Sequence, residues 1–378
     1  MSRLLRSPRS AALLAVTAAA TGIALAAPAT AFASPGSQPA NHDNGRNLVL
    51  SQVNLASDVA GLAPLTDPDL KNPWGVSFTP TSPLWVSNQG TNSSTLYTLA
   101  SGSSTVAKVP TVRVTMAGSV AGPTGQVANT GTGFVVSNGT TSAPAAFIFA
   151  TLDGHIEAWN PTVDPLIGNA ENKATVAGAG YTGLAIANNH LFAADFVTGR
   201  VDVFNSSFHR VKLASWQFRD SRLPRGYRAF NAQALNGNVF VTYDKANPAT
   251  GREAVGKGLG VVDEFSTSGR LIARIASGAP LNAPWGLAIA PSSWGHAAGS
   301  LLIGNFGDGR INVFARERHG FAQRSTSHVQ VAGTGKAFAE PGLWALQPGT
   351  ATTGGTNALW FTAGINGEQD GLLGVLRP

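Results

Sequence analysis

The sequence predicts an all-β protein in which small antiparallel sheets repeat around a ring, and three observations support this prediction. The chain of 378 residues contains 44 glycines and 22 prolines, and 43% of its residues are hydrophobic. A short segment that begins a strand recurs six times, at intervals of 49 to 58 residues. Apolar strands that end in polar turns follow most copies, and no long amphipathic helix is evident after the N-terminal region.

The N-terminal region has the three parts of a secretory signal peptide. These parts are a basic start at Arg3, Arg6 and Arg9, an apolar region at 11–27, and small residues at Ala31 and Ala33. An uncleaved membrane anchor is the alternative, but the apolar region is short and alanine-rich for a span of about 20 residues. We therefore expect a signal peptide at 1–33, a flexible lead-in at 34–46, and a secreted protein with no transmembrane segment after cleavage.

The six repeated segments are strands rich in small residues. They lie at 73–78, 123–128, 181–186, 230–235, 284–289 and 341–346. Small side chains suit a crowded place where several strands converge. Six copies spaced by about 54 residues, each a small antiparallel sheet, are typical of a six-bladed β-propeller with four-stranded blades.

The two ends of the chain predict how the ring closes. From Leu343 only 36 residues remain, which is enough for three strands but not for a fourth. The missing strand is expected from 47–53, an apolar stretch that precedes the first repeat. Pairing this N-terminal strand into the last blade would close the ring and remove an open sheet edge. We therefore expect 47–378 to form a single β-propeller domain; a pair of β-sandwiches is the alternative.

Several motifs resemble known propellers. The run Pro73-Trp74-Gly75, together with Leu-Phe-Ala-Ala-Asp-Phe at 191–196 and Gly-Arg-Val-Asp-Val-Phe at 199–204, resembles an NHL-type blade. From residue 47 to the end, the chain resembles a family of exported bacterial propeller proteins that carries no assigned activity. Its architecture is more distantly similar to the calcium-dependent lactonases of the gluconolactonase type.

Asparagine and aspartate recur in loops that this architecture gathers on one face. They are Asn72, Asn88, Asp153, Asp195, Asn231, Asp244, Asn282, Asn305 and Asn366. The resemblance to the lactonases implies calcium, which prefers oxygen ligands. Asp195, Asp244 and Asn305 are the candidate metal ligands, and Asp153 is the candidate catalytic carboxylate that would activate water. The alternative is structural, since both residue types suit the turns that end strands.

A second candidate site is the central funnel of the ring. Trp74, Trp285 and Trp344 lie in or beside the repeated inner strands and would form an aromatic wall for a sugar or planar ligand. Asn72, Asn231 and Asn282 are the polar candidates at the same funnel. The alternative for the tryptophans is packing between blades.

Basic residues gather in the connection between the third and fourth repeats. They are Arg210, Lys212, Arg219, Arg222, Arg225 and Arg228, with Asp220 as the only acidic residue among them. The pattern favours a solvated loop, with contact to anionic surface polymers as the alternative. Over the whole chain the formal net charge is +6, or +3 after loss of Arg3, Arg6 and Arg9, which is too weak to indicate nucleic-acid binding.

Two functions of different class follow. The leading interpretation is an exported, monomeric binding or scaffolding module that recognises a small molecule, a glycan or an envelope protein through its loop face and funnel. The alternative is a calcium-assisted lactone or ester hydrolase. The chain has no cysteine and no Gly-x-Ser-x-Gly nucleophile motif, so it is left open whether the protein is an enzyme.

Overall fold

The structure is a computed structural model, and it describes residues 47–317, 320–322 and 327–378. All of these residues fall within one compact unit. The signal peptide and lead-in expected at 1–33 and 34–46 lie outside the described residues. No helix in the described part of the chain is long and apolar enough to cross a membrane.

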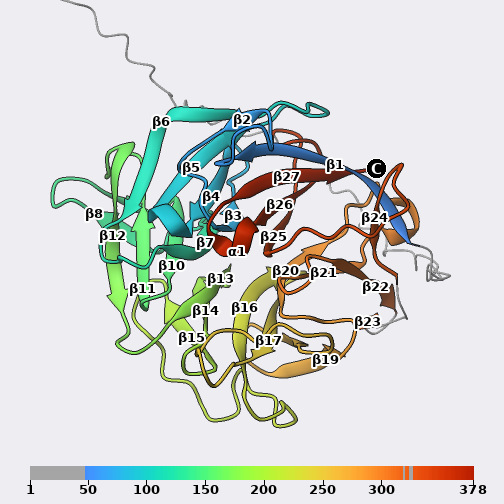
Figure 1. The fold of residues 1–378 in the computed structure, drawn as a ribbon. Helices are drawn as coiled ribbons and strands as arrows, with labels where there is room; N and C mark the ends of the chain where they lie inside the picture. The colour runs from blue at the N-terminus through green and yellow to red at the C-terminus, as the bar shows by residue number, and fades with distance from the viewer. Residues whose placement is uncertain (1–46, 318–319, 323–326) are drawn as a thin grey trace, which may run out of the picture. The chain divides into compact units, whose positions relative to one another are not determined.

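The described chain is a β-propeller, and its inner strands form a closed ring (Figure 1). These strands are β3 (Pro73–Ser77), β7 (Pro123–Ala128), β13 (Tyr181–Ala187), β16 (Tyr227–Leu235), β20 (Pro284–Ile289) and β25 (Leu343–Pro348). Each contacts the next one along the chain, and β25 contacts β3. The inner strands coincide with the six repeats. We interpret this ring as six blades.

The remaining strands extend each blade outward from its inner strand. In the first blade they are β4 (Leu84–Asn88), β5 (Ser93–Thr98) and β6 (Ala107–Met116), and in the second β10 (Phe147–Thr151), β11 (His155–Trp159) and β12 (Ile167–Thr175). In the fourth they are β17 (Asn238–Lys245), β18 (Val261–Phe265) and β19 (Leu271–Ser277), and in the fifth β21 (Leu301–Asn305), β22 (Ile311–Glu317) and β23 (Gly320–Ala322). A small hairpin of β8 (Val135–Ser137) and β9 (Ser142–Pro144) projects from the second blade.

The N-terminal strand completes the last blade, as predicted from the two chain ends. β1 (Leu48–Ser57) pairs antiparallel with β27 (Leu372–Arg377), which in turn pairs with β26 (Leu359–Ala363). The short strand β2 (Leu65–Thr66) pairs with the end of β1 on its other side, and β24 (Val329–Val331) pairs with the beginning of β1. These pairings cover part of the edge that β1 would otherwise leave open.

The inner strands approach each other too closely for larger side chains, which explains the small residues of the repeats. A Cβ atom built on Gly125 of β7 would lie 2.2 Å from the backbone nitrogen of Leu184 on β13. One built on Gly286 of β20 would lie 2.5 Å from the backbone oxygen of Trp344 on β25. Glycine at these positions is therefore required by contact between adjacent blades.

The third blade departs from the four-strand pattern. Its sheet contains β13, β14 (His190–Asp195) and β15 (Arg200–Asn205), and no fourth strand from the described residues joins them. The side chain of Asn205 accepts hydrogen bonds from the backbone nitrogens of Ser207 and His209, which ends β15 in a tight turn. Only an isolated bridge between Phe204 and Arg210 continues the pairing. Residues 206–226 therefore leave the sheet as a long connection to the fourth blade.

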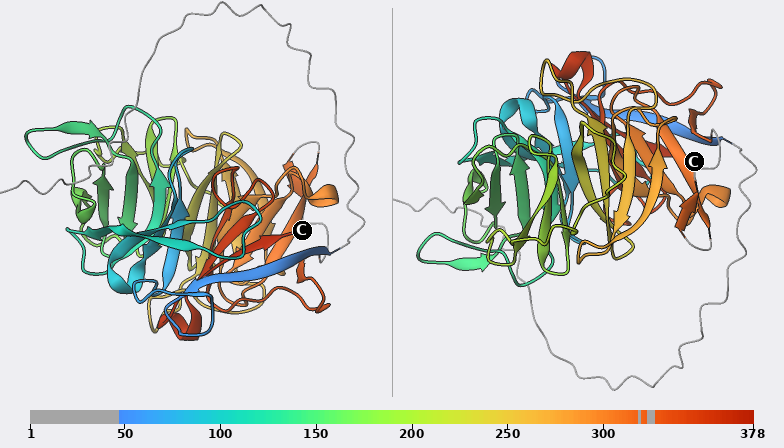
Figure 2. Two further views of the ribbon diagram at one scale, coloured as in Figure 1. Left: turned by 90° about the horizontal axis from the view of Figure 1, so that it is seen from above. Right: turned by 90° about the horizontal axis from the view of Figure 1, so that it is seen from below.

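A short helical turn lies at one face of the ring. α1 (Ile365–Glu368) follows β26, and in the two side views it is the red coil at the edge of the propeller (Figure 2). Asn366, Gly367 and Glu368 all have positive φ angles, of 52°, 66° and 68°. The side chain of Glu368 pairs with Arg252 and accepts a hydrogen bond of 3.2 Å from Asn72 Nδ2. These contacts hold the turn over the start of the inner strands.

Candidate functional site

The three tryptophans of the candidate funnel contact one another at the ring axis. Trp74 stacks on Trp344 with ring centroids 3.5 Å apart, and Trp285 packs edge-on against Trp344 at 5.7 Å. Phe306 stacks on Trp344 at 4.2 Å, and Phe230 packs against it at 6.0 Å. All five rings are buried. We call these five residues the aromatic plug, because they fill the part of the ring axis where the sequence predicted a ligand-binding funnel.

The predicted polar funnel residues hold the plug in place. Asn72 Oδ1 accepts a hydrogen bond of 3.0 Å from Trp344 Nε1, and Asn231 Nδ2 donates one of 2.8 Å to the backbone oxygen of Trp285. Asn282 instead supports a loop, because its Oδ1 accepts a hydrogen bond of 2.7 Å from the backbone nitrogen of Gly256. The structure thus brings the three tryptophans together with Asn72 and Asn231. These contacts agree with the packing alternative for the tryptophans.

Little space remains along the axis beyond the plug. The cavity lined by the inner strands has a volume of about 10 Å³. Gln126 and Gln233 lie among its polar lining residues. Such a volume is close to the minimum for a single water molecule. A small-molecule ligand at the axis would therefore have to displace buried side chains.

The three candidate metal ligands lie at the ends of second strands in three different blades. Both carboxylate oxygens of Asp195 already accept hydrogen bonds, Oδ1 from the backbone nitrogen of Gly180 at 3.0 Å and Oδ2 from the Thr198 hydroxyl. Asp244 Oδ1 and Asn305 Oδ1 are buried and have no hydrogen-bond partner among the described residues. Burial raises the pKa of Asp244 to about 7.

The calcium site stays a prediction for these three residues. Among residues 47–317, 320–322 and 327–378, no group of three or more His, Asp or Glu side chains is placed to hold a metal ion. Calcium takes six to eight oxygen ligands. The metal role of Asp195, Asp244 and Asn305 stays a prediction without support from the geometry, and we derive no reaction step through a metal.

We expect that removing divalent metal leaves the stability of the protein unchanged. A bound ion would raise the unfolding midpoint in proportion to its occupancy of the folded state. The thermal midpoint should therefore be the same in EDTA as in millimolar calcium, measured by differential scanning calorimetry. A midpoint that falls in EDTA and recovers with calcium would contradict this expectation and would restore the hydrolase hypothesis.

Asp153, the candidate catalytic carboxylate, is held as an ion by its neighbours. Burial by itself would raise the pKa of Asp153, but hydrogen bonds from Thr151, Ser119 and His155 outweigh it and hold the pKa well below its ordinary value. The hydroxyl oxygens of Thr151 and Ser119 lie 2.6 and 2.7 Å from Asp153 Oδ1. A carboxylate with so low a pKa is a poor general base at neutral pH. The geometry fits an anchor for the 119–121 turn.

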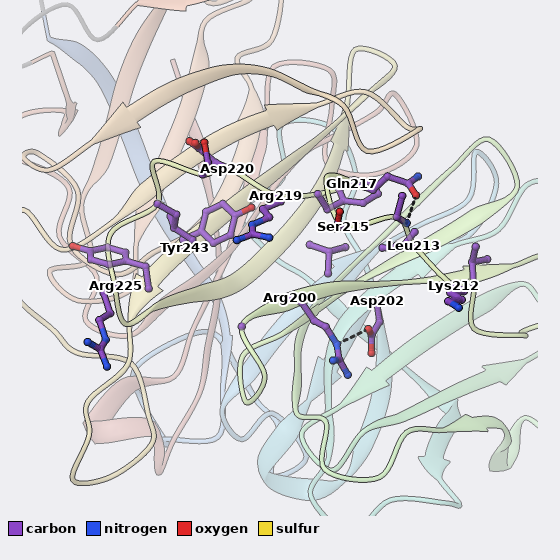
Figure 3. A pocket seen from close by; sticks show the side chains of 18 of the residues that line it. Arg200, Asp202, Lys212, Leu213, Ser215, Gln217, Arg219, Asp220, Arg225 and Tyr243 are labelled. Carbon is purple, nitrogen blue, oxygen red and sulfur yellow. Dashed lines mark hydrogen bonds and ion pairs between the residues drawn. The ribbon is translucent and has the colours of Figure 1, made fainter.

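A second cavity lies away from the axis, between the third and fourth blades (Figure 3). Its volume is about 830 Å³, and it is lined by β15, by most of residues 210–226 and by Tyr227 and Tyr243 of the fourth blade. We call it the interblade pocket. A volume between about 300 and 1,000 Å³ is usual for a small-molecule site.

The pocket exists because residues 206–226 are tied to two sheets at once. On the third blade, the backbone nitrogen of Val211 donates to the oxygen of Val203 at 2.7 Å. On the fourth, the backbone nitrogen of Phe218 donates to the oxygen of Gly269 at 2.8 Å, and Asp220 pairs with Arg274 of β19. The connection therefore spans the gap between the blades and leaves a hollow where an outer strand would lie.

Charge on the pocket wall is mostly positive. Basic side chains in the lining are Arg200, Arg210, Lys212, Arg219 and Arg225, and the acidic ones are Asp202 and Asp220. Arg200 and Arg210 both pair with the buried Asp202, at 3.0 and 2.7 Å. The dashed line between Arg200 and Asp202 in Figure 3 marks the first of these pairs. Asp220 is neutralised by Arg274 and Arg222, neither of which lines the pocket.

Tyr243 lies in the wall beside a buried acidic pair. Its hydroxyl is buried and has no hydrogen-bond partner among the described residues. Burial raises the pKa of Tyr243 well above its ordinary value, with Asp263 and Asp220 adding to the effect, so the hydroxyl keeps its proton. Burial also raises the pKa of Asp263 to about 7, although Arg274 lies 3.3 Å away. Tyr243 is thus a hydrogen-bond donor with no acceptor.

The sequence predicted a basic cluster in this region but did not predict a pocket. It assigned the charges at 210–228 to a solvated loop, and it passed over Arg200, Asp202 and Tyr243. The length of the connection is the sequence feature that could have indicated the pocket. Between the end of β15 and the start of β16 lie 21 residues, 206–226, without a regular strand, and long loops of this kind are often functional.

Comparison with known proteins gives relatives of the whole propeller. No protein-family model matches the chain. Two proteins of Acanthamoeba polyphaga mimivirus, uncharacterised protein R648 and uncharacterised protein L690, are 32% and 33% identical to it over 330 residues. The alignments cover 85% of this chain, with 78% of the first viral protein and 84% of the second. The chain belongs to the family of these viral proteins. The names of these two relatives assign no activity to the R648/L690 family. Both relatives are viral, so the expected membership of an exported bacterial family stays a prediction.

Solved structures with a similar fold are much more distant from this member of the R648/L690 family. Virginiamycin B lyase from Staphylococcus aureus is 12% identical with a TM-score of 0.45, covering 87% of this chain and 99% of the lyase. A gluconolactonase from Xanthomonas campestris is 13% identical with a TM-score of 0.37, covering 61% of this chain and 81% of that one. Neither likeness brings an activity to the R648/L690 family.

Proposed function

We propose that this chain is an exported ligand-binding β-propeller whose ligand is a small molecule held in the interblade pocket. The observation that carries the proposal is the pocket of about 830 Å³ between β15 and the fourth blade. The axial cavity lined by the inner strands is far smaller, at about 10 Å³. Export rests on the signal-peptide features of residues 1–33.

The pocket combines the features by which proteins hold small molecules. Val201, Val211 and Leu223 supply apolar surface in the lining, and arginine and lysine side chains supply polar contacts. Concave sites with a mainly apolar wall and a few directional polar groups are the usual form of such sites. The binding role therefore moves from the funnel, where the sequence placed it, to the side of the ring.

Filling the pocket should abolish ligand binding and leave the fold intact. Ala214 is exposed and lines the pocket, so Ala214→Trp places a large ring in the hollow without burying it in a core. Ala249→Trp is the matched control, because Ala249 is exposed in a loop outside the pocket. We expect compounds that raise the thermal midpoint of the unaltered protein in a metabolite screen to fail with Ala214→Trp and to succeed with Ala249→Trp.

One result of this screen would contradict the proposal. Compounds that stabilise both tryptophan variants as they stabilise the unaltered protein would bind elsewhere, and the pocket would not be the ligand site. Circular dichroism of both variants checks that the β-sheet content is unchanged.

A further inference from the structure

We infer that the interblade pocket selects a phosphorylated ring compound, such as a sugar phosphate or a nucleoside monophosphate. This inference rests on the proposed function, because it names the ligand class of the same pocket. Three features of the wall point to this chemistry: unpaired positive charge, an unpartnered donor, and an aromatic ring that lines the cavity.

Three basic side chains of the pocket have no acidic partner. Lys212, Arg219 and Arg225 form no ion pair among the described residues, and all three are exposed. The two acidic lining residues are already neutralised by other arginines. A concave wall with excess positive charge concentrates anions, and guanidinium groups bind phosphate oxygens in pairs. A phosphate monoester carries about −1.5 to −2 charges at neutral pH, which suits three unpaired cations better than a single carboxylate would.

Tyr243 supplies the second feature. Tyr243 lines the pocket and is 3% exposed, and its buried hydroxyl has no hydrogen-bond partner among the described residues. Leaving a buried hydroxyl unpaired is costly, so such groups usually have an acceptor in the functional state. The negatively charged oxygens of a phosphate are strong acceptors for a hydroxyl donor.

Tyr227 supplies the third feature. It is half-buried and lines the pocket from the first residue of β16. An aromatic ring in the pocket wall offers a flat apolar surface against which a sugar or a base can stack.

The test uses defined probes with the full-length protein. Glucose 6-phosphate and AMP represent the two sources of the ligand chemistry, inorganic phosphate represents the anion alone, and glucose and adenosine are the uncharged counterparts. Affinities are measured by isothermal titration calorimetry at low and high salt. We expect at least one of the two esters to bind, with affinity that falls as salt rises, and we expect glucose and adenosine not to bind.

Variants assign the binding to the named side chains. Arg219→Ala combined with Arg225→Ala should weaken ester binding by tenfold or more, because charge-assisted hydrogen bonds are lost. Arg316→Ala, an exposed arginine of β22 outside the pocket, is the matched control and should leave binding unchanged. Tyr243→Phe should weaken ester binding about fivefold to tenfold without lowering the thermal midpoint, since the lost hydroxyl has no partner in the protein. Tyr227→Ala should weaken binding of the esters and not of inorganic phosphate.

The outcomes separate this inference from the proposed function. Uncharged compounds that bind as well as the esters, and whose binding Ala214→Trp abolishes, would overturn the phosphate inference and leave the pocket as a ligand site. Ester binding that survives the double arginine variant would also overturn the inference. No binding of either ester at millimolar concentration would refute the ligand class, and ester binding that survives Ala214→Trp would refute the site as well.

Discussion

Replacing Trp344 with alanine should lower the free energy of unfolding by about 3–5 kcal/mol. Trp344 is 0% exposed and is the central ring of the aromatic plug, stacked between Trp74 at 3.5 Å and Phe306 at 4.2 Å. Its removal leaves a large cavity where inner strands of several blades meet, and the backbone ring around the plug cannot collapse to fill it. Loss of the indole also leaves Asn72 Oδ1 without its buried donor.

Equilibrium unfolding in guanidinium chloride, followed by circular dichroism, measures this effect. Trp216→Ala is the matched control, because it removes the same side chain from a position that is 56% exposed. The control should change the free energy of unfolding by no more than about 0.5 kcal/mol. Similar, small effects for both variants would show that the plug is not the structural centre of the ring.

A single methyl group on an inner strand should have an effect of the same order. For Gly125→Ala we expect a loss of about 3 kcal/mol in the free energy of unfolding, at the upper end of overpacking effects. The new Cβ would lie 2.2 Å from Leu184 N and 2.6 Å from the carbonyl carbon of Gly183, both backbone atoms of β13. β13 cannot retreat, because Gly183 is itself packed against Asn231 of the next blade.

The control for Gly125→Ala is a glycine that meets no backbone. Gly131 is exposed in a loop, and a Cβ there would meet only side-chain oxygens, at 3.3 and 3.5 Å. Gly131→Ala should therefore leave the denaturation midpoint close to that of the unaltered protein, within the usual range for surface substitutions. A Gly125→Ala protein that unfolds at the same denaturant concentration as Gly131→Ala would contradict the close approach of β7 and β13.

Much of the architecture could be predicted from the sequence because it is written in local patterns. Small residues at the repeat starts mark the inner strands, and the glycine of Pro73-Trp74-Gly75 lies where β3 approaches β7. The short C-terminal remainder after Leu343 predicted the pairing of β1 with β27. Strand periodicity depends on neighbouring residues alone, so it can be read from one sequence.

The side chains of the candidate site depended on contacts that no local pattern encodes. Asp195 and Asn72 are residue types that bind metals and ligands, but each is committed to hydrogen bonds with its own turn or with the plug. These contacts agree with the alternative interpretation, in which the aspartates and asparagines stabilise turns. Whether an oxygen is free is decided by which donors the fold brings to it, often from another blade.

By itself, the sequence determined that this protein is a ring of repeated antiparallel sheets whose N-terminal strand closes the last one. Only the tertiary structure decided where a ligand can fit. The tryptophans close the axis because rings from several inner strands meet there and exclude water from a large apolar surface. The interblade pocket opens because residues 206–226 bond to two sheets far apart in sequence, so that Tyr243 and Arg219 come to line one cavity.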